Sequence, residues 1–187
     1  MHRARRERGV TPEQIKALVR TIPDFPIPGI DFRDVTTLLG NGPGFAASVA
    51  WLAEQAGASG ADAIAGLEAR GFIFGAAVAS ALGLGFVPVR KPGKLPVPTI
   101  GIDYALEYGR DRLEIDPEAI SAGLRVVIVD DLLATGGTAS AAVDLLRQAG
   151  AAVDHAIFAI ELPDLRGRTV LEARGVEVAA LMGFAGH

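Results

Sequence analysis

From about residue 61 to the end, the chain alternates between short apolar runs and segments with helical spacing. Residues 126–129 are all β-branched and apolar, which is typical of a buried strand. Helices that connect successive strands favour parallel pairing, so the pattern predicts an α/β fold with a central, mostly parallel sheet flanked by helices. The expected strands are 61–67, 86–89, 113–115, 125–129, 153–160 and 176–181, and the expected helices are 71–82, 138–148 and 168–174.

The first 60 residues are interrupted more often by proline and glycine. Thr11, Pro12 and Glu13 have the order of an N-cap, a first-turn proline and a first-turn acid, so a helix is expected to begin there. Prolines at 23, 26 and 28 end that helix. A short strand over 32–39, a loop over 40–44 and a helix over 45–55 are expected to follow.

Residues 90–104 form the least regular stretch, with three prolines and two glycines. This is too long for an ordinary connection between elements, which predicts a functional loop. We expect residues 90–108 to act as a lid that is poorly ordered without ligand.

Composition and charge narrow the classes of function. The 187 residues are half hydrophobic and carry a net charge of −4, which argues against nucleic acid as a partner. The absence of cysteine excludes a disulfide or a thiolate site, and three scattered histidines do not suggest a metal site. No apolar run approaches ~18 residues, so no membrane partner is expected. We expect a cytoplasmic protein with a basic, disordered arm over 1–10 and a single domain over 11–187.

Polar clusters follow three of the expected strands. They are Glu68 to Gly71, then Arg90 and Lys91, then Asp130 and Asp131, which stand where the third strand should end. Ligands of parallel α/β sheets bind at the carboxyl ends of strands, so these clusters predict one site.

The turn 134–138, Ala-Thr-Gly-Gly-Thr, indicates what that site binds. Backbone N–H groups, two hydroxyls and a helix N-terminus suit a phosphate, and the adjacent carboxylates can accept hydrogen bonds from sugar hydroxyls. A sugar phosphate is therefore the expected ligand. The chain contains neither G-x-x-x-x-G-K-[ST] nor G-x-G-x-x-G, which disfavours a Walker loop and a dinucleotide site.

Each cluster also has a plainer interpretation. Asp130 and Asp131 could be solvated acids beside a capped helix. Arg70 could be a structural partner of Glu68. The basic residues of 90–94 could serve only to solvate a loop.

The turn and the strand before it also carry a family resemblance. Residues 127–138 resemble the signature of type I phosphoribosyltransferases, which bind phosphoribosyl pyrophosphate. Four further segments, 25–34, 66–72, 90–96 and 104–109, resemble the adenine phosphoribosyltransferases in particular. The resemblance covers about residues 15–181. Two features depart from it: Pro92 stands where many relatives have a basic residue, and the basic arm before Val10 has no recognised counterpart.

The resemblance implies a type I phosphoribosyltransferase-like fold with a small N-terminal hood and a flexible catalytic loop. The implied activity is purine salvage, in which adenine and phosphoribosyl pyrophosphate give AMP and pyrophosphate. It further implies a homodimer, and Mg²⁺ as cofactor, held through substrate and water with Asp130 and Asp131 as the candidate protein contacts. Two alternatives stay open: transfer to xanthine, hypoxanthine or guanine, and a non-catalytic, ligand-sensing regulator on the same fold.

The same resemblance assigns roles to individual residues. Asp130 and Asp131 would hold the ribose hydroxyls, and Ala134, Thr135, Gly136, Gly137 and Thr138 the 5′-phosphate. Glu68, Ala69, Arg70, Arg90, Lys91 and Lys94 would lie beside the pyrophosphate, with a cis peptide bond between Glu68 and Ala69. Ile30, Asp31, Phe32, Arg33 and Arg70 would frame adenine, and Glu107 would assist proton transfer at the purine.

Overall fold

The computed structural model describes residues 10–105 and 109–186. These fall into two compact units, Met1–Ser48 and Val49–His187. The single domain expected over 11–187 stays a prediction, and the expected arm lies almost entirely outside the described residues. No helix in the described part of the chain has the length and apolar character needed to cross a membrane.

The first unit consists of short elements. Helix α1 (Pro12–Lys16) begins with the expected cap: Thr11 Oγ1 accepts a hydrogen bond from Gln14 N–H, and Gln14 Oε1 accepts one from Thr11 N–H. Strand β1 (Arg20–Ile22), which the sequence did not predict, pairs antiparallel with β2 (Phe32–Asp34). The remaining elements are α2 (Thr36–Leu39) and the start of α3 (Gly42–Ala58).

The expected strand over 32–39 is wrong in its second half, where the structure has helix α2. The reason lies at Asp34, whose Oδ1 accepts a hydrogen bond from Thr36 N–H at 2.9 Å. This local bond turns the backbone out of the strand. The other carboxylate oxygen, Oδ2, accepts hydrogen bonds from Arg20 at 2.5 and 3.2 Å.

Asp34 gives a prediction for stability in acid. Hydrogen bonds from Thr36 and then from Arg20 lower the pKa of Asp34 from 3.8 to about 2. The pKa of Asp34 is lower in the folded protein than in the unfolded chain. The ionised carboxylate therefore stabilises the fold at any pH above the unfolded-state pKa, and this stabilisation is lost as the pH falls through the folded-state pKa. Asp34→Asn should therefore flatten the fall of the melting temperature between pH about 4 and about 2, measured by circular dichroism. Asp154→Asn, the same change at an exposed side chain, should retain the wild-type slope.

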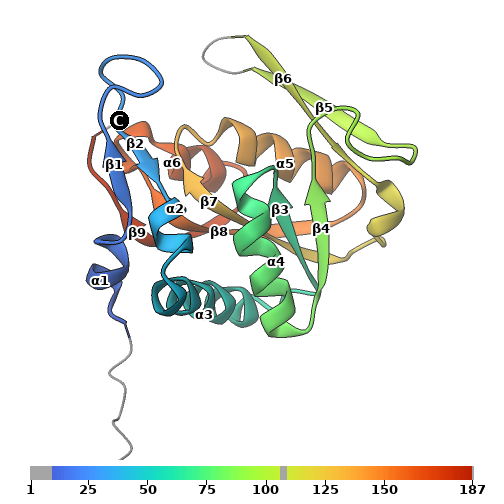
Figure 1. Cartoon of the computed structure of the whole chain (residues 1–187). Helices are drawn as coiled ribbons and strands as arrows, with labels where there is room; N and C mark the ends of the chain where they lie inside the picture. The colour runs from blue at the N-terminus through green and yellow to red at the C-terminus, as the bar shows by residue number, and fades with distance from the viewer. Residues whose placement is uncertain (1–9, 106–108, 187) are drawn as a thin grey trace, which may run out of the picture. The chain divides into compact units, whose positions relative to one another are not determined.

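The second unit is built on a five-stranded parallel sheet, which confirms the predicted fold class (Figure 1). The strand order is β4-β3-β7-β8-β9, with helices in the connections. The strands are β3 (Ala63–Leu67), β4 (Gly85–Val89), β7 (Arg125–Leu133), β8 (Ala152–Glu161) and β9 (Glu177–Gly183), and the helices are α4 (Arg70–Leu82), α5 (Gly137–Gln148) and α6 (Gly167–Glu172).

An antiparallel hairpin lies beside the sheet, formed by β5 (Ile100–Ala105) and β6 (Arg110–Ile115). The sequence predicted only a short strand at 113–115 and an irregular chain up to 104, so this prediction is corrected. Cross-strand pairs explain the hairpin, because Asp103 faces Arg112 and Tyr104 faces Asp111. Residues 106–108 lie outside the described residues, so the prediction that the 90–108 lid is poorly ordered without ligand stays a prediction.

The core of the second unit lies between the sheet, α5 and the hairpin. Every residue of β3 is buried, and Leu113 and Ile115 of β6 join β7 and β8 side chains in one apolar cluster. Each fully buried large aliphatic or aromatic side chain contributes about 1.5–3 kcal/mol relative to an exposed one. This packing fixes the hairpin and the carboxyl ends of β3 and β7 in one body, which matters for the site.

Candidate functional site

The candidate site lies between β3 and β7, where successive strands stop being added on one side of the sheet and begin to be added on the other. From β3 the chain steps outward to β4, whereas β7, β8 and β9 follow on the other side. Crevices at such a switch point are where open α/β sheets bind ligands. Pairing between β3 and β7 ends at Gly66 and Val129, so β7 continues alone on this side. A pocket of about 240 Å³ opens there.

The pocket brings together most of the residues singled out in the sequence. The polar clusters after β3 and β7 both line it, and one residue after β4 joins them. Of the residues proposed for the site, its lining includes Glu68, Ala69, Arg70, Lys91, Asp130, Asp131, Ala134, Thr135, Gly136, Gly137 and Thr138.

Asp130 and Asp131 lie inside strand β7, which corrects the expectation that the strand ends at residue 129. The ladder to β8 continues to the pairs Leu132–Ile160 and Leu133–Glu161, and these backbone bonds outweigh the low strand propensity of aspartate. Burial raises the pKa of both carboxyl groups, and the neighbouring charge of Asp131 raises that of Asp130 further. The plainer interpretation, two solvated acids, is therefore wrong.

Asp131 is 4% exposed and faces the guanidinium of Arg70, with Nε 2.8 Å from Oδ2. That oxygen still accepts no hydrogen bond from the described residues. The charge of Arg70 works against the effect of burial on the pKa of Asp131 without cancelling it. A ligand that brings hydroxyl donors or a cation to Oδ2 would favour the ionised carboxylate.

Asp130 is held by its own backbone and by a close helix. Its Oδ1 accepts a hydrogen bond from Asp131 N–H at 2.8 Å. A Cβ on Gly71, in the first turn of α4, would lie 3.1 Å from Asp130 Cγ and closer still to Oδ1. Glycine at this position thus lets α4 approach the carboxylate, which explains the Arg70-Gly71 pair in the sequence.

The turn 134–138 leads into α5 through Gly136, whose φ is +82°. Glycine adopts this left-handed conformation without the strain other residues suffer. Gly136 also stands at the N-cap of α5, so no side chain caps the first turn of this helix. Backbone N–H groups at such a terminus, with the positive end of the helix dipole, suit an anion.

Gly167, at the start of α6, supports this turn from behind. A Cβ on Gly167 would lie 3.0 Å from Gly136 N and closer still to Ala134 O. A bidentate pair fixes the residue after it: Arg168 donates hydrogen bonds to both carboxylate oxygens of Glu161, at 2.5 and 2.9 Å. Sequence reasoning missed Gly167, because no local motif shows that these two backbones meet.

Glu68 and Arg70 do not pair with each other, as the plainer interpretation of Arg70 would require, but with other residues. Glu68 accepts hydrogen bonds from Arg90 Nε at 3.2 Å and from the backbone N–H of Lys91 at 2.9 Å, whereas Arg70 pairs with Asp131. The Lys91 N–H is also the largest cause of the lowered pKa of Glu68. The peptide bond between Glu68 and Ala69 is cis, as expected. Glu68 thus ties the end of β4 to the loop after β3.

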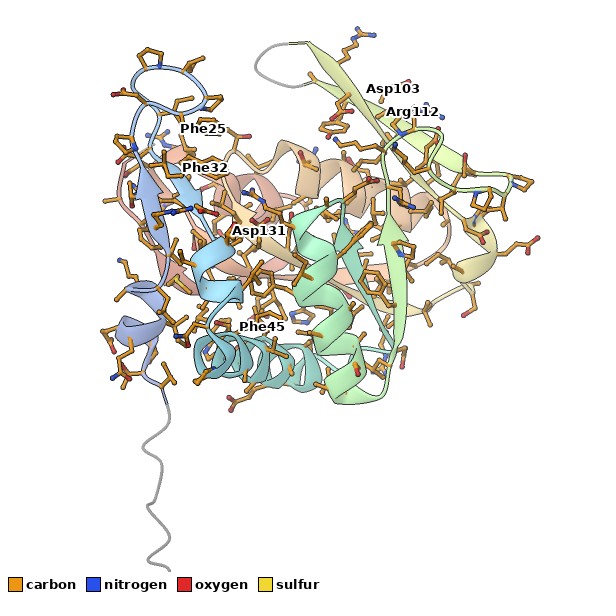
Figure 2. The ribbon with its side chains drawn as sticks, viewed as in Figure 1. Phe25, Phe32, Phe45, Asp103, Arg112 and Asp131 are labelled. Atoms are coloured by element: carbon orange, nitrogen blue, oxygen red, sulfur yellow. The ribbon has the colours of Figure 1, made fainter. Side chains whose placement is uncertain are left out.

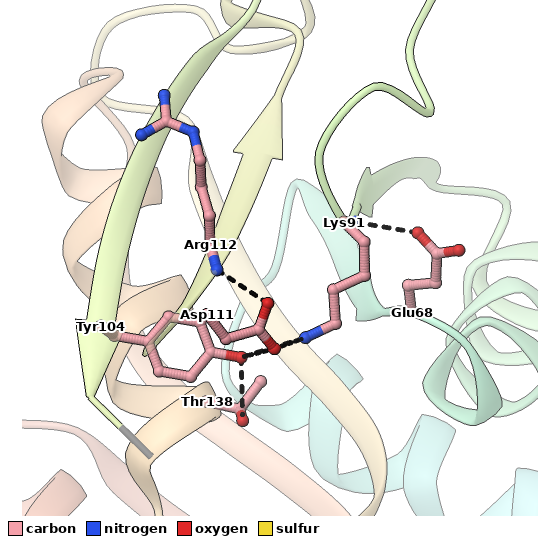
Figure 3. A network of polar contacts seen from close by, with 6 residues as sticks. All are labelled: Glu68, Lys91, Tyr104, Asp111, Arg112 and Thr138. Carbon is pink, nitrogen blue, oxygen red and sulfur yellow. Dashed lines mark hydrogen bonds and ion pairs between the residues drawn. The ribbon is translucent and has the colours of Figure 1, made fainter. Parts of the chain in front are cut away.

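Lys91 reaches across the pocket to the hairpin (Figure 3). Its ammonium contacts the carboxylate of Asp111 and lies 3.1 Å from the hydroxyl of Tyr104. Tyr104 donates a hydrogen bond to Asp111 and accepts one from Thr138 at 3.4 Å. The sequence does not mark Tyr104 and Asp111 as site residues, since only the register of the unpredicted hairpin puts them opposite each other.

Several expected site residues are not brought into the pocket. Arg90 and Lys94 lie beside it, joined by a hydrogen bond from Arg90 Nη1 to the Lys94 carbonyl. Arg33 belongs to the first unit, where it donates to Thr21 Oγ1 at 2.5 Å. Ile30, Asp31 and Phe32 belong to that unit too, so the pocket of the second unit does not test the base site. Glu107 lies outside the described residues.

The carboxylate oxygens of Asp130 and Asp131 are groups of the pocket that could contact a metal ion. Within the described ranges, no three His, Cys, Asp or Glu side chains cluster closely enough to hold a metal ion. The buried Oδ2 of Asp131, with Asp130 beside it, nevertheless fits water-bound Mg²⁺, which prefers to retain waters and to share phosphate oxygens.

Comparison with known proteins gives consistent matches. The phosphoribosyl transferase domain family matches residues 36–171. An adenine phosphoribosyltransferase from Novosphingobium aromaticivorans is 67% identical over 178 residues, which cover 95% of this chain and all of that protein. One from Erythrobacter litoralis is 65% identical over the same shares. The crystal structure of an adenine phosphoribosyltransferase from Thermoanaerobacter pseudethanolicus has a TM-score of 0.89 at 50% identity, covering 93% of this chain and 100% of that one.

Proposed function

This chain belongs to the adenine phosphoribosyltransferase family, and we propose that the pocket around Asp130 and Asp131 carries the reaction of that family. The protein is a pentosyltransferase of purine salvage, which converts adenine and phosphoribosyl pyrophosphate to AMP and pyrophosphate. The observation that carries the assignment of this reaction to the pocket is the union, in one cavity, of two adjacent carboxylates, the half-buried Asp130 and the buried Asp131, with a glycine-rich helix N-terminus.

The pocket supports distinct roles for its two sides. Asp130 and Asp131 would accept hydrogen bonds from the two ribose hydroxyls, so Asp131 Oδ2 would gain a hydrogen-bond donor beside its ion pair with Arg70. The turn 134–138 would hold the 5′-phosphate by backbone N–H groups and by the hydroxyls of Thr135 and Thr138. One pentose phosphate would thereby satisfy both the acceptors and the donors of the site.

The remaining basic residues would serve the pyrophosphate. Departure of pyrophosphate from C1′ builds negative charge on its oxygens while positive charge develops on the sugar, in a transition state like that of glycoside cleavage. Lys91, Arg90 and Lys94 would neutralise the negative charge on the pyrophosphate. Arg70 lines the same pocket as Lys91. Glu68 is a poor direct ligand for an anion, and its bonds to Arg90 and to Lys91 N–H indicate that it orients them.

Mg²⁺ is proposed as the cofactor because water, phosphate oxygens and one or two carboxylates are its usual ligands. Asp130 and Asp131 would hold it through water, together with oxygens of the substrate. When bound, Mg²⁺ supplies positive charge that stabilises the leaving pyrophosphate.

Adenine recognition is proposed for Ile30 to Arg33 and Arg70, on the resemblance of their segments. The relative from Saccharomyces cerevisiae, 41% identical with a TM-score of 0.84, was crystallised with adenine and an imino-altritol bisphosphate. These two ligands support a site for adenine and a site for a sugar phosphate in this chain.

Turnover tests the proposed function. The protein, Mg²⁺ and phosphoribosyl pyrophosphate are mixed with adenine, hypoxanthine, guanine or xanthine, and nucleotide and pyrophosphate are quantified. AMP from adenine, at a kcat/KM at least about tenfold above the other bases, is expected. Equal or better turnover of another purine would transfer the assignment to that base, and no turnover with any base would favour a ligand-sensing regulator.

Glu107 is proposed as the base that accepts the N9 proton of adenine. Glu107→Gln retains size but cannot take up a proton, so kcat should fall by about 10²-fold or more with little change in KM for adenine. Single-turnover kinetics isolate the chemical step. An unchanged single-turnover rate would remove Glu107 from this role.

The homodimer and the cytoplasmic location stay proposals as well. The homodimer rests on the resemblance, which puts one basic residue of the 90–94 segment across a subunit interface. Light scattering of the purified protein measures its mass directly, and a mass of one chain at assay concentration would argue against the dimer.

A further inference from the structure

The strongest observation outside the roles above is the environment of the Lys91 ammonium (Figure 3). Lys91 lines the pocket, yet its charge is already paired with Asp111 on β6. Tyr104 on β5 adds a second acceptor at 3.1 Å and presents its ring to the ammonium at 5.7 Å. Side chains from the segment after β4, from β5 and from β6 thus meet at the Lys91 ammonium beside the pocket.

Asp111 is the end point of this network. Thr138 Oγ1 donates to Tyr104 Oη at 3.4 Å, Tyr104 Oη donates to Asp111 Oδ2 at 3.0 Å, and Lys91 donates to the same oxygen. Thr138 belongs to the turn proposed to hold the 5′-phosphate. One carboxylate therefore engages, directly or through Tyr104, two of the donors that an anionic ligand needs.

The charges are consistent with an ion pair. Lys91 loses hydration by burial, which works to lower its pKa, but hydrogen bonds to Asp111 and Tyr104 outweigh this and raise the pKa of Lys91. The hydrogen bond from Lys91 is the largest cause of the lowered pKa of Asp111. Both groups are charged near neutral pH, so the pair neutralises a cation inside an anion site.

We propose that Asp111 is a positioning residue that competes with the pyrophosphate group for Lys91, holding the ammonium at the pocket wall when pyrophosphate is absent and taking it back as pyrophosphate leaves. This inference rests on the proposed function of the pocket, since it assumes that Lys91 serves the pyrophosphate. It adds a residue that acts through Lys91 and sets how tightly substrate and product are held.

The competition between Asp111 and pyrophosphate for Lys91 should weaken the binding of pyrophosphate. A ligand phosphate must share or replace the Asp111 carboxylate at Lys91, so the native pair reduces the gain from binding. Asparagine at position 111 retains the shape and removes the charge. The Lys91 side chain is 35% exposed and that of Asp111 27%, which indicates a modest effect, on the order of fivefold in affinity.

The test is calorimetric titration of inorganic pyrophosphate, with Mg²⁺, into wild type, Asp111→Asn and Asp103→Asn. Asp103 is a matched control: it lies on the same hairpin, pairs with Arg112, and stands apart from Asp131 (Figure 2). Asp111→Asn should lower Kd for pyrophosphate about fivefold, and Asp103→Asn should leave it unchanged. In turnover, KM for phosphoribosyl pyrophosphate should fall in Asp111→Asn while kcat does not rise, a split that simple loss of structure would not give.

A double-mutant cycle tests whether Asp111 affects pyrophosphate binding through Lys91. In a Lys91→Ala background, Asp111→Asn should change Kd for pyrophosphate by less than about twofold, because the group it acts through is gone. If Asp111→Asn does not fold by circular dichroism, Tyr104→Phe replaces it and should tighten binding in the same direction by a smaller factor.

Weaker or unchanged pyrophosphate binding in Asp111→Asn overturns the proposal, as does an equal gain in Asp103→Asn or a gain that persists without Lys91. Absence of pyrophosphate binding to wild type overturns it too. AMP formation from adenine by the same preparation then separates the two ideas, because turnover would show that the proposed function stands while this inference fails.

Discussion

Asp131→Asn is expected to lower kcat/KM for phosphoribosyl pyrophosphate by about 100-fold and to leave the protein at least as stable as wild type. The carboxylate is 4% exposed, and burial raises its pKa, so its charge costs folding free energy. The amide has the same shape without that cost. It cannot, however, offer two anionic acceptors to ribose hydroxyls or to a hydrated cation.

Steady-state kinetics and thermal unfolding on the same samples check both halves of this prediction. Asp103→Asn, an exposed aspartate on the hairpin, serves as control and should retain both activity and melting temperature. Activity within about threefold of wild type would show that Asp131 does not contact the reacting sugar. A large fall in melting temperature would show that the pair with Arg70 is a stabilising contact instead.

Gly167→Ala should weaken binding of phosphoribosyl pyrophosphate by about tenfold or more and also destabilise the fold. The added Cβ would lie 2.8 Å from Leu133 Cδ1 and 3.0 Å from Gly136 N, so α6 or the turn 134–138 must shift. Overpacking of this kind costs about 1–3 kcal/mol. A displaced turn also misaligns the N–H groups proposed for the 5′-phosphate.

The measurements are KM for phosphoribosyl pyrophosphate, Kd for ribose 5-phosphate and the melting temperature. Gly85→Ala is the matched control, because a Cβ at this position would meet nothing within 4 Å. We expect the control to behave as wild type. Wild-type KM and Kd in Gly167→Ala would mean that the turn does not depend on α6 for its position.

Much of the fold could be predicted because the second unit obeys simple periodicities. All five strands of its sheet were expected within a few residues of where they lie, and so were α4, α5 and α6. Buried parallel strands are continuous apolar runs, and the helices between them contain small residues at their contacts with the sheet. Local pattern and long-range packing agree in these elements, so the sequence alone is sufficient.

The wrong boundaries occur where pairing partners decide the local structure. Strand β7 continues through Asp130 and Asp131 because β8 runs beside it, and 100–105 is a strand because 110–115 pairs with it. Strand β1 forms for the same reason, through its pairs with β2. Asp130 and Asp131 have a low strand propensity, whereas 100–105 has alternating Ile100, Ile102 and Tyr104 but follows a segment rich in proline. In each case the partner strand lies at least several residues away in the chain.

Sequence by itself determined the chemistry of this protein: two adjacent carboxylates, a glycine-rich turn at a helix start, and basic residues after a strand, in an order typical of one family. Only the tertiary structure decided how these groups act on one another. It buries Asp131 against Arg70, supports the turn with Gly167, and places Asp111 and Tyr104 at Lys91. The reason is that residue types and short spacings set which bonds a segment can make. Burial and competition for a charge depend on which distant segments the sheet brings together.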